Sequence, residues 1–483
     1  MTVSLIEPET LEKPHGDPPA AALHPTAQRE PYPVEFAGWL PCFRFFGDCG
    51  HHPQFSHTEA PPDGYRFVRS NPHSEADPAA VSDGKGSRAA MGILNAVWLL
   101  LRPIGSVLRH AQTIGMGQTL QTLVCVVRMF FMLRWAGCKI APTVQFLRTR
   151  HFPSQVLVPP GSTLMFLTSI PFTFNQRPWV IEIEDPTTLF FPFHNNGGTA
   201  HTSIQSSPYL PVVKALLESD ACRGVVTHMR STAEALPKLF GSDLITAKTH
   251  YVPYGTTLPP DAPERPSSGP LDLLFTCSWH QIPESFFWRG GLDLLRAFET
   301  IHERYPHVRL TLRTRLPAMP ARFRQVLEKC WVRVIDRYLP DDDMDELMRG
   351  SHIFVLPACR IHVVSVLRAM AYGQAVVVSD GWGFREYVEH DRNGMVVPGR
   401  YGKASWMDDA GMLREDHYGA MFNSDAEVAR GLIETISTLV ENNELRQRLG
   451  AQARRDVATR FSLANWNRGL QKALDRATGR ANC

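Results

Sequence analysis

The clearest pattern of hydrophobic and polar positions lies between residues 351 and 398. It opens with an apolar run of the length of one buried strand, which ends at Pro357. Apolar residues then recur at helical spacing from Val363 to Met370, Gly373 is placed to end that helix, and a second buried strand follows over Ala375–Val378. Strand, helix and strand at this spacing predict a parallel crossover unit. Because such sheets bind ligands beyond the carboxyl ends of their strands, the segment is predicted to line a site for an anion.

Similar runs of strand length recur in the first half of the chain, with helical patterns in the gaps. The predicted strands are Gln155–Val158, Leu164–Leu167, Trp179–Ile183, Gly224–Thr227 and His250–Val252, and the predicted helices include Tyr209–Glu218 and Thr232–Phe240. Strands that alternate with helices indicate a second parallel sheet. The proline-rich stretch 259–270 is typical of a stiff linker, and the pattern of strands and helices resumes at Leu271.

Residues 1–85 are rich in Pro, His, Gly and Ser with little periodicity, so we predict a disordered or loosely draped extension. Two denser aromatic patches, Phe36–Phe55 and Asp63–Val68, indicate that part of it docks on something. This stretch also holds Cys42, Cys49, His51, His52 and His57. Their spacing matches no standard zinc pattern, so packing is favoured over a metal site.

Length and composition narrow the class of protein. With 483 residues, the chain is long enough for two domains, and 43% hydrophobic and 20% charged residues are globular values. A net charge of +2 gives no support for nucleic acid as the main partner. Nine scattered cysteines without a CxxC pair favour a reduced, cytoplasmic chain, and the first residues lack the pattern of a signal peptide.

Two apolar segments, Met91–Leu101 and Thr119–Trp135, are shorter than the roughly 20 residues that a membrane span needs, and Arg128 and Arg134 interrupt the second. One interpretation is a pair of buried or half-buried helices in the first domain. The other is a peripheral membrane surface, because arginines beside aromatic residues suit an anionic bilayer face.

The segment 351–398 resembles the nucleotide-sugar-binding half of retaining glycosyltransferases of family 4. The motif residues in place are Pro357, Ala369, Met370, Ala371, Gly373, Val377, Val378, Ser379, Asp380, Gly383, Glu386, Asn393 and Gly394. The resemblance extends from Leu271 to the end of the chain, is weak over the first domain and is absent over residues 1–85. Both glutamates of the family's Glu-x7-Glu motif are replaced, by Arg360 and Arg368.

This resemblance implies an α/β protein of the GT-B fold, with two Rossmann-like domains that face each other across a cleft. The expected divisions are the extension 1–85, an N-terminal acceptor domain 86–262, a C-terminal nucleotide-sugar-binding domain 263–455 and a closing C-terminal helix 456–483. A nucleotide-diphosphate sugar is then the substrate, and neither a metal nor another cofactor is expected.

The resemblance also implies the donor site. Arg289 stands where the family has the lysine of a Lys-Gly pair, at a helix start, and is expected to neutralise the leaving diphosphate as a catalytic residue. His280 lies nearest to the place of the family's second cation, but its charge is weaker and depends on pH. Gly383 and Glu386 match the loop that binds the donor.

Arg360 and Arg368 leave three interpretations open. Arginine accepts no hydrogen bond, so Arg368 makes no ribose contact of the usual kind, although the eight-residue spacing still allows both side chains to face one cleft. In the first interpretation, the two arginines bind an acidic sugar or the diphosphate. In the second, the donor is held through Glu386 and loop amides instead. In the third, the domain is a degenerate, non-catalytic relative.

On the acceptor side, Glu184 and Asp185 follow the predicted strand Trp179–Ile183 and are placed to contact an acceptor hydroxyl, with Glu184 as the catalytic candidate. His194 belongs to a polar loop that is expected to cover the cleft and bind the acceptor. His228 follows a strand, where a core histidine is at least as expected as a ligand.

The expected function is therefore a retaining glycosyltransferase that transfers a sugar from a nucleotide-activated donor to a glycan or lipid-linked acceptor. The expected setting is bacterial surface polysaccharide or exopolysaccharide synthesis, in the cytoplasm or at the inner face of the membrane. The alternative is a degenerate, non-catalytic GT-B protein that serves as a binding module or scaffold.

Overall fold

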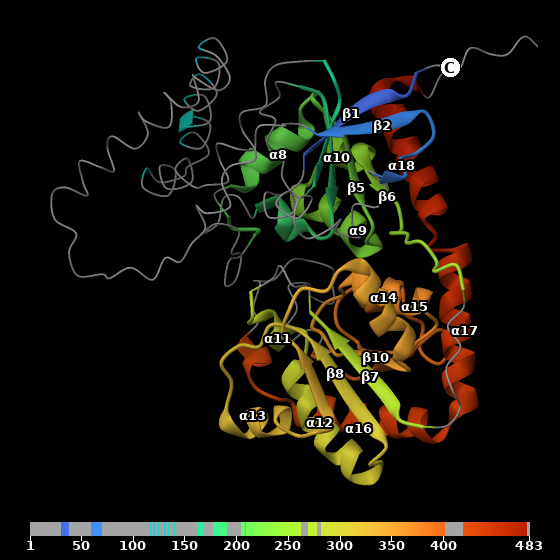
Figure 1. Cartoon of the computed structure of the whole chain (residues 1–483). Helices are drawn as coiled ribbons and strands as arrows, with labels where there is room; N and C mark the ends of the chain where they lie inside the picture. Colours follow the sequence, from blue (N-terminus) through green and yellow to red (C-terminus); the bar gives the residue numbers. More distant parts are fainter. Residues whose placement is uncertain are drawn as a thin grey trace, which may run out of the picture.

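The computed structural model describes residues 30–37, 59–69, 162–168, 177–190, 204–207, 209–261, 269–277, 282–400 and 419–480, with eight helical positions between 116 and 140. Two parallel six-stranded sheets lie one above the other, each flanked by helices (Figure 1). The predicted α/β class, with two Rossmann-like domains of the GT-B type, is confirmed.

The first sheet has the strand order β2-β1-β3-β4-β5-β6, and each neighbouring pair is parallel. Its strands are β1 Tyr32–Ala37, β2 Tyr65–Arg69, β3 Met165–Thr168, β4 Trp179–Ile183, β5 Cys222–Thr227 and β6 Thr249–Tyr251. Its helices are η3 Pro186–Phe190, α8 Leu210–Glu218, α9 Arg230–Phe240 and α10 Asp243–Lys248. The central strands β3 and β4 are buried on both faces, which explains their continuous apolar runs. The predicted strand Gln155–Val158 lies outside the described residues.

The first sheet begins earlier than the sequence predicted. Residues 1–85 were expected to form a largely disordered or draped extension, with the first domain beginning at residue 86, and β1 and β2 lie within that stretch. Strand β1 pairs with β3 through Glu35 and Met165, so this part of the extension belongs to the first sheet. These strands are short, contain or follow prolines and depend on a partner far along the chain, so periodicity alone gave little sign of them. The docking predicted for the aromatic patches is confirmed at Phe36 and Tyr65, which are buried.

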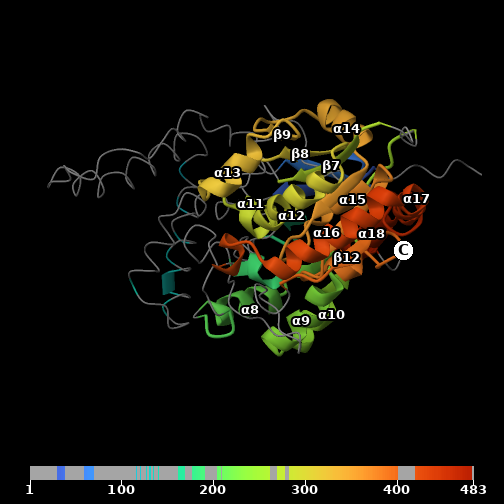
Figure 2. The same ribbon diagram turned by 90° about the horizontal axis from the view of Figure 1, so that it is seen from below.

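The second sheet has the order β12-β11-β10-β7-β8-β9, which is the doubly wound order 3-2-1-4-5-6. Its strands are β7 Leu271–Thr276, β8 Val308–Arg313, β9 Val332–Ile335, β10 Ile353–Leu356, β11 Ala375–Ser379 and β12 Met395–Val397. Its helices are α11 Ser285–Trp288, α12 Gly291–Arg304, α13 Ala321–Leu327, α14 Asp341–Gly350, α15 Val363–Ala371 and α16 Ala426–Glu441, with short turns at η5 Phe384–Glu386 and η6 Gly419–Phe422. The crossover β10-α15-β11 confirms the predicted strand, helix and strand. Seen from below, α12 and α16 lie side by side, as do α15 and α17 (Figure 2).

Two helices at the end of the chain join the domains. Helix α17 (Asn443–Thr459) packs on α15 and β11, whereas α18 (Leu463–Thr478) packs on β4 and β5 of the first domain. Ser462 begins α18 and lies so close to Gly255 that a Cβ there would be 2.2 Å from its carbonyl oxygen. The Tyr65 hydroxyl donates to Asp475 at 2.6 Å. The last helix therefore holds the early strand β2 and the first sheet together.

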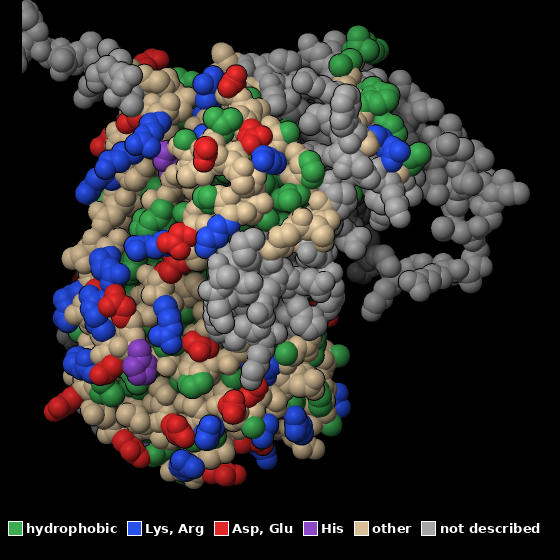
Figure 3. Space-filling model, turned by 180° about the vertical axis from the view of Figure 1, so that it is seen from behind, with side chains coloured by type: hydrophobic (Ala, Val, Ile, Leu, Met, Phe, Trp, Pro, Cys, Tyr) green, Lys and Arg blue, Asp and Glu red, His purple; other side chains and the backbone are tan. Residues whose placement is uncertain are grey.

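Asp456 anchors α17 to the turn before β12. Its buried carboxylate accepts from Arg392 Nη1 at 2.8 Å and from Asn393 Nδ2 at 2.7 Å. Burial raises the pKa of Asp456, but the hydrogen bonds from Asn393 and Arg392 outweigh it and the net pKa is lowered. Seen from behind, Lys and Arg side chains gather along the left edge of the molecule, with acidic side chains among them (Figure 3). The motif residue Asn393 thus has a structural role.

A buried ion pair fixes the segment that follows β12. Asp293, in the first turn of α12, accepts from Arg400 Nη2 at 2.9 Å and from the Asp425 N–H at 2.6 Å. Burial raises the pKa of Asp293 to about 6, although Arg400 opposes the change. The folded chain therefore holds this proton at pH values where the unfolded chain has already released it.

This pair predicts a component of stability that falls with rising pH. Because the folded pKa lies above the ordinary value of 3.8, the stabilising effect of the proton is present below about pH 4 and is lost as the pH rises to about 6. The difference in unfolding free energy between wild type and Asp293→Asn should fall by about 3 kcal/mol over that window. Urea unfolding at several pH values measures it, and a difference that stays constant contradicts the assignment.

Candidate functional site

The two domains meet where the strands of both sheets end. Residues that follow β4 and β5 contact residues that follow β10 and β11, in the region between the two sheets in Figure 1. Ligands of parallel sheets bind at such carboxyl ends.

Arg289 is a buried cation at the end of α11, only 1% exposed. Its Nη1 donates to the Thr276 carbonyl oxygen at 2.9 Å, at the end of β7. The next residue, Gly290, has φ 79° and lies against Pro357, where a Cβ would be 2.2 Å from the carbonyl oxygen. Burial lowers the pKa of the Arg289 guanidinium, and the nearby charge of Arg360 lowers it further. The backbone thus places a fixed positive charge at the second domain's carboxyl edge.

His362 joins this group at the N-terminus of α15. Burial lowers the pKa of its imidazole well below the usual range, and the positive charges of Arg289 and Arg360 add to the effect. Its Nε2 is buried and has no hydrogen-bond partner among the described residues. The His362 imidazole therefore lies near the positive charges of Arg289 and Arg360, at the positive end of α15. Sequence reasoning missed His362, whose only signal is a polar residue just before the apolar helical pattern.

Arg360 reaches across the junction to the first domain. Its Nη1 donates to Asp185 Oδ2 at 3.0 Å, and Asp185 is fully buried. The other Asp185 oxygen accepts from the Thr187 N–H at 2.9 Å. The Asp185 carboxylate therefore already has protein donors on both of its oxygens, one of them from the opposite domain.

Arg368 lies elsewhere. It binds the acidic start of α14, with Nη2 at 2.5 Å from Asp345 Oδ1 and Nη1 at 3.5 Å from Asp341 Oδ1. Arg360 precedes α15, which begins only at Val363, so the eight-residue spacing does not lie on one helix. The structure thus places the two arginines on different partners.

Glu386 and Gly383 both contact the turn between β5 and α9. Glu386 Oε2 accepts from the Arg230 N–H at 2.5 Å, and Oε1 accepts from the N–H and Oγ of Ser231 at 3.0 and 2.6 Å. Gly383 has φ 82°, and a Cβ there would lie 2.3 Å from Met229 Cε. This left-handed φ is the backbone conformation that favours glycine.

Glu184 is half-buried beside a buried pair of ionisable side chains. His228 Nδ1 lies 3.5 Å from Glu182 Oε1, and both side chains are 1% exposed. Burial lowers the pKa of His228, but Glu182 and Glu184 outweigh it and the net pKa is raised. The position of His228 is thus that of a core residue, whereas Glu184 remains at the junction.

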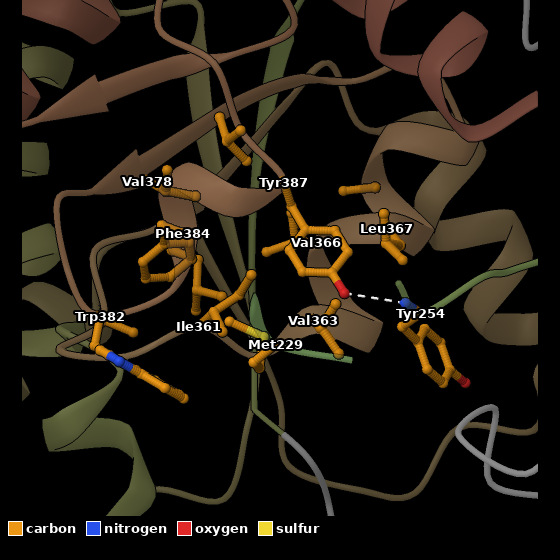
Figure 4. Close-up of a cluster of buried hydrophobic side chains, with 14 of the residues drawn as sticks. Met229, Tyr254, Ile361, Val363, Val366, Leu367, Val378, Trp382, Phe384 and Tyr387 are labelled. Carbon is orange, nitrogen blue, oxygen red and sulfur yellow. Dashed lines mark hydrogen bonds between the residues drawn. The ribbon is translucent and has the colours of Figure 1, made fainter. Parts of the chain in front are cut away.

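Apolar side chains from both domains also pack against one another at the junction (Figure 4). Met229 and Tyr254 come from the first domain, and the surrounding cluster from the second includes Ile361, Trp382 and Tyr387. The Tyr387 hydroxyl donates to the His228 carbonyl oxygen at 2.6 Å and accepts from the Tyr254 N–H at 3.0 Å.

The other predictions concern His280, His194, metal binding and membrane spans. His280 and His194 lie outside the described residues, as does the cysteine and histidine group between residues 42 and 57. Within the described ranges, no three His, Cys, Asp or Glu side chains are grouped as a metal ion would require. No helix in the described part of the chain has the length and apolar character to cross a membrane.

Residues 285–416 match the model of a family described as Glycosyl transferases group 1. No curated protein sequence matches the chain. Similar solved structures include Anabaena Alr3699/HepE in complex with UDP and glucose, with 16% identity, a TM-score of 0.44 and coverage of 65% of this chain and 77% of that chain. A glycosyltransferase from Rickettsia africae has 10% identity, a TM-score of 0.48 and coverage of 94% and 100%. Sucrose-phosphate synthase from Thermosynechococcus elongatus has 14% identity, a TM-score of 0.44 and coverage of 66% and 74%.

The family match covers the second domain's side of the junction. It includes Arg289, Arg360, Arg368 and Glu386 but neither Glu184 nor Asp185. The resemblance of the second half to glycosyltransferases is thereby confirmed at the level of a group 1 domain. Membership of family 4 stays a prediction.

Proposed function

We propose that the chain is a glycosyltransferase that transfers a sugar from a nucleotide-activated donor to a glycan or lipid-linked acceptor. The match of residues 285–416 to the group 1 family carries this proposal. The geometry supports it, because Arg289 and the N-terminus of α15 converge at the carboxyl edge of the second sheet. A fixed cation beside a helix N-terminus suits a diphosphate.

In this proposal, Arg289 stabilises the charge that develops on the leaving diphosphate. The bond from the sugar to the diphosphate oxygen breaks with its electron pair going to the diphosphate, and a new bond forms to the acceptor oxygen. Glu184 is the proposed catalytic carboxylate that receives the acceptor proton. The donor side is lined by Arg360, Gly383, His280 and Glu386. Arg368 binds α14 and is not assigned to the donor. The acceptor side includes Asp185 and His194.

The finer features of the proposal rest on the family resemblance. They are retention of configuration, neutralisation of the diphosphate by protein groups without a metal or cofactor, and a place in bacterial surface polysaccharide or exopolysaccharide synthesis in the cytoplasm. Peripheral membrane contact is proposed for the helical positions Met116, Leu120, Val124, Val127 and Phe131, whose apolar side chains are exposed. If the protein pellets with anionic vesicles and salt releases it, that contact is supported. Equal recovery of the protein in the supernatant with and without vesicles excludes it.

Nucleotide binding and sugar transfer test the function. Each of UDP, GDP and ADP is added to the full chain, and its melting temperature is measured. A nucleotide present at a hundredfold its dissociation constant stabilises the folded chain by about 2.7 kcal/mol. Transfer from a panel of sugar nucleotides in the presence of EDTA then tests both the chemistry and its independence of metal. Absence of both stabilisation and transfer refutes the proposal.

One observation favours a non-catalytic binding or scaffold protein as the second candidate. Arg360 and Arg368, which stand where the family resemblance implies the two motif glutamates, are both bound to carboxylates of the chain itself, Asp185 and Asp345. Nucleotide stabilisation without any transfer across the whole panel is the result expected of such a binding protein.

A further inference from the structure

Helix α9 has no N-terminal capping side chain of its own. Its N-cap residue is Met229, whose side chain offers no acceptor, and the first turn carries no acidic residue. The first N–H groups of a helix have no partner within the helix and require an acceptor, and a negative charge there is favourable. The sequence of α9 supplies neither.

The second domain supplies both. Glu386 places one carboxylate oxygen 2.5 Å from the Arg230 nitrogen and the other 3.0 Å from the Ser231 nitrogen, and the Ser231 hydroxyl donates to it at 2.6 Å. The carboxylate thus takes the position of an N-terminal cap although it lies 155 residues or more along the chain. Both oxygens of the Glu386 carboxylate thus accept hydrogen bonds from the opposite domain.

Neighbouring contacts join the same two surfaces. Arg360 binds Asp185, and Tyr387 bridges His228 and Tyr254. All of these lie at the carboxyl ends of strands, where a ligand must enter. Glu386 lies next to Tyr387 and three residues after Gly383, which approaches Met229, so one short loop carries several of the contacts between the domains.

We propose that Glu386 is an interdomain latch, a carboxylate that caps α9 and holds the junction closed in the ligand-free chain. Release of this carboxylate from α9 is then a step that precedes entry of a ligand between the domains. The loop that resembles a donor-binding loop therefore has a second use, and the Glu386 oxygens are available to a donor only after they leave α9. This proposal does not require the chain to transfer sugars.

Hydrogen exchange on the ligand-free full chain tests the latch directly. The amides of Arg230 and Ser231 should be protected in the wild type, which is unusual for the first turn of a helix. In Glu386→Ala their exchange should be about ten- to a hundredfold faster, the effect expected from loss of a charged acceptor. In addition, Arg360→Ala/Glu386→Ala should show a larger radius of gyration by small-angle X-ray scattering.

Three controls keep the outcome decisive. Arg385→Ala alters the exposed neighbour of Glu386 and should leave both amides protected. Ser231→Ala removes only the hydroxyl on the other side of the contact and should speed exchange at these amides by a smaller factor. Amides of α17 report whether Glu386→Ala unfolds the chain as a whole, in which case Ser231→Ala decides. Equal exchange at Arg230 and Ser231 in wild type and in a folded Glu386→Ala overturns the proposal, as does Ser231→Ala without local effect.

Discussion

Arg289→Ala is expected to weaken the binding of a nucleoside diphosphate by about ten- to a hundredfold and to remove most sugar transfer. The guanidinium is a buried cation at the carboxyl edge of the second sheet, where the diphosphate is proposed to bind. Loss of a charge-assisted contact to phosphate costs about 1.5–3 kcal/mol. Titration calorimetry with the nucleotide that stabilises the wild type measures the change.

The control for this variant must separate binding from folding. Because Arg289 also holds the Thr276 carbonyl, alanine is expected to lower the melting temperature as well. Arg289→Lys keeps the positive charge but loses the planar fork, so it should retain part of the affinity. A folded Arg289→Ala with unchanged affinity would place the diphosphate elsewhere.

The sequence predicted those parts of the fold in which local pattern and burial agree. The crossover β10-α15-β11 is an example, because both strands are buried and the helix has one apolar face. Strands β1 and β2 were missed because each is short and is recognisable as a strand only from its pairing, β1 with β3 and the two with each other. The return of α18 to the first sheet is likewise a tertiary contact that its amphipathic pattern does not specify.

The same holds for the candidate site, where local sequence predicted some features and contacts between the domains determine others. The place of Arg289 at the edge of the second sheet followed from a motif and its neighbouring glycine. In contrast, the expectation that Arg360 and Arg368 share one cleft assumed a continuous helix, whereas α15 begins three residues after Arg360. The partners of Glu386 and Arg360 come from the other domain, so they depend on how the domains close and not on local sequence.

Arg360→Glu and Arg368→Glu are expected to have very different effects, although the resemblance to family 4 implies a glutamate at both positions. The first places a carboxylate against Asp185, which is fully buried, and breaking a buried pair costs about 3 kcal/mol or more. The second faces Asp341 and Asp345, which are 57% and 40% exposed, so the expected loss is about 1 kcal/mol or less. Urea unfolding of both variants measures the contrast, and equal losses would contradict the assigned partners.

A second substitution shows what Arg360 does for activity. If its main role is to join the domains through Asp185, then adding Asp185→Asn to Arg360→Glu removes the repulsion between two carboxylates and should recover part of the stability and of the transfer. If Arg360 instead binds an anionic group of the donor, Asp185→Asn should recover stability alone, because the new glutamate still repels the donor. The rate of transfer by the double variant, relative to Arg360→Glu, therefore distinguishes a residue that closes the junction from one that binds the donor.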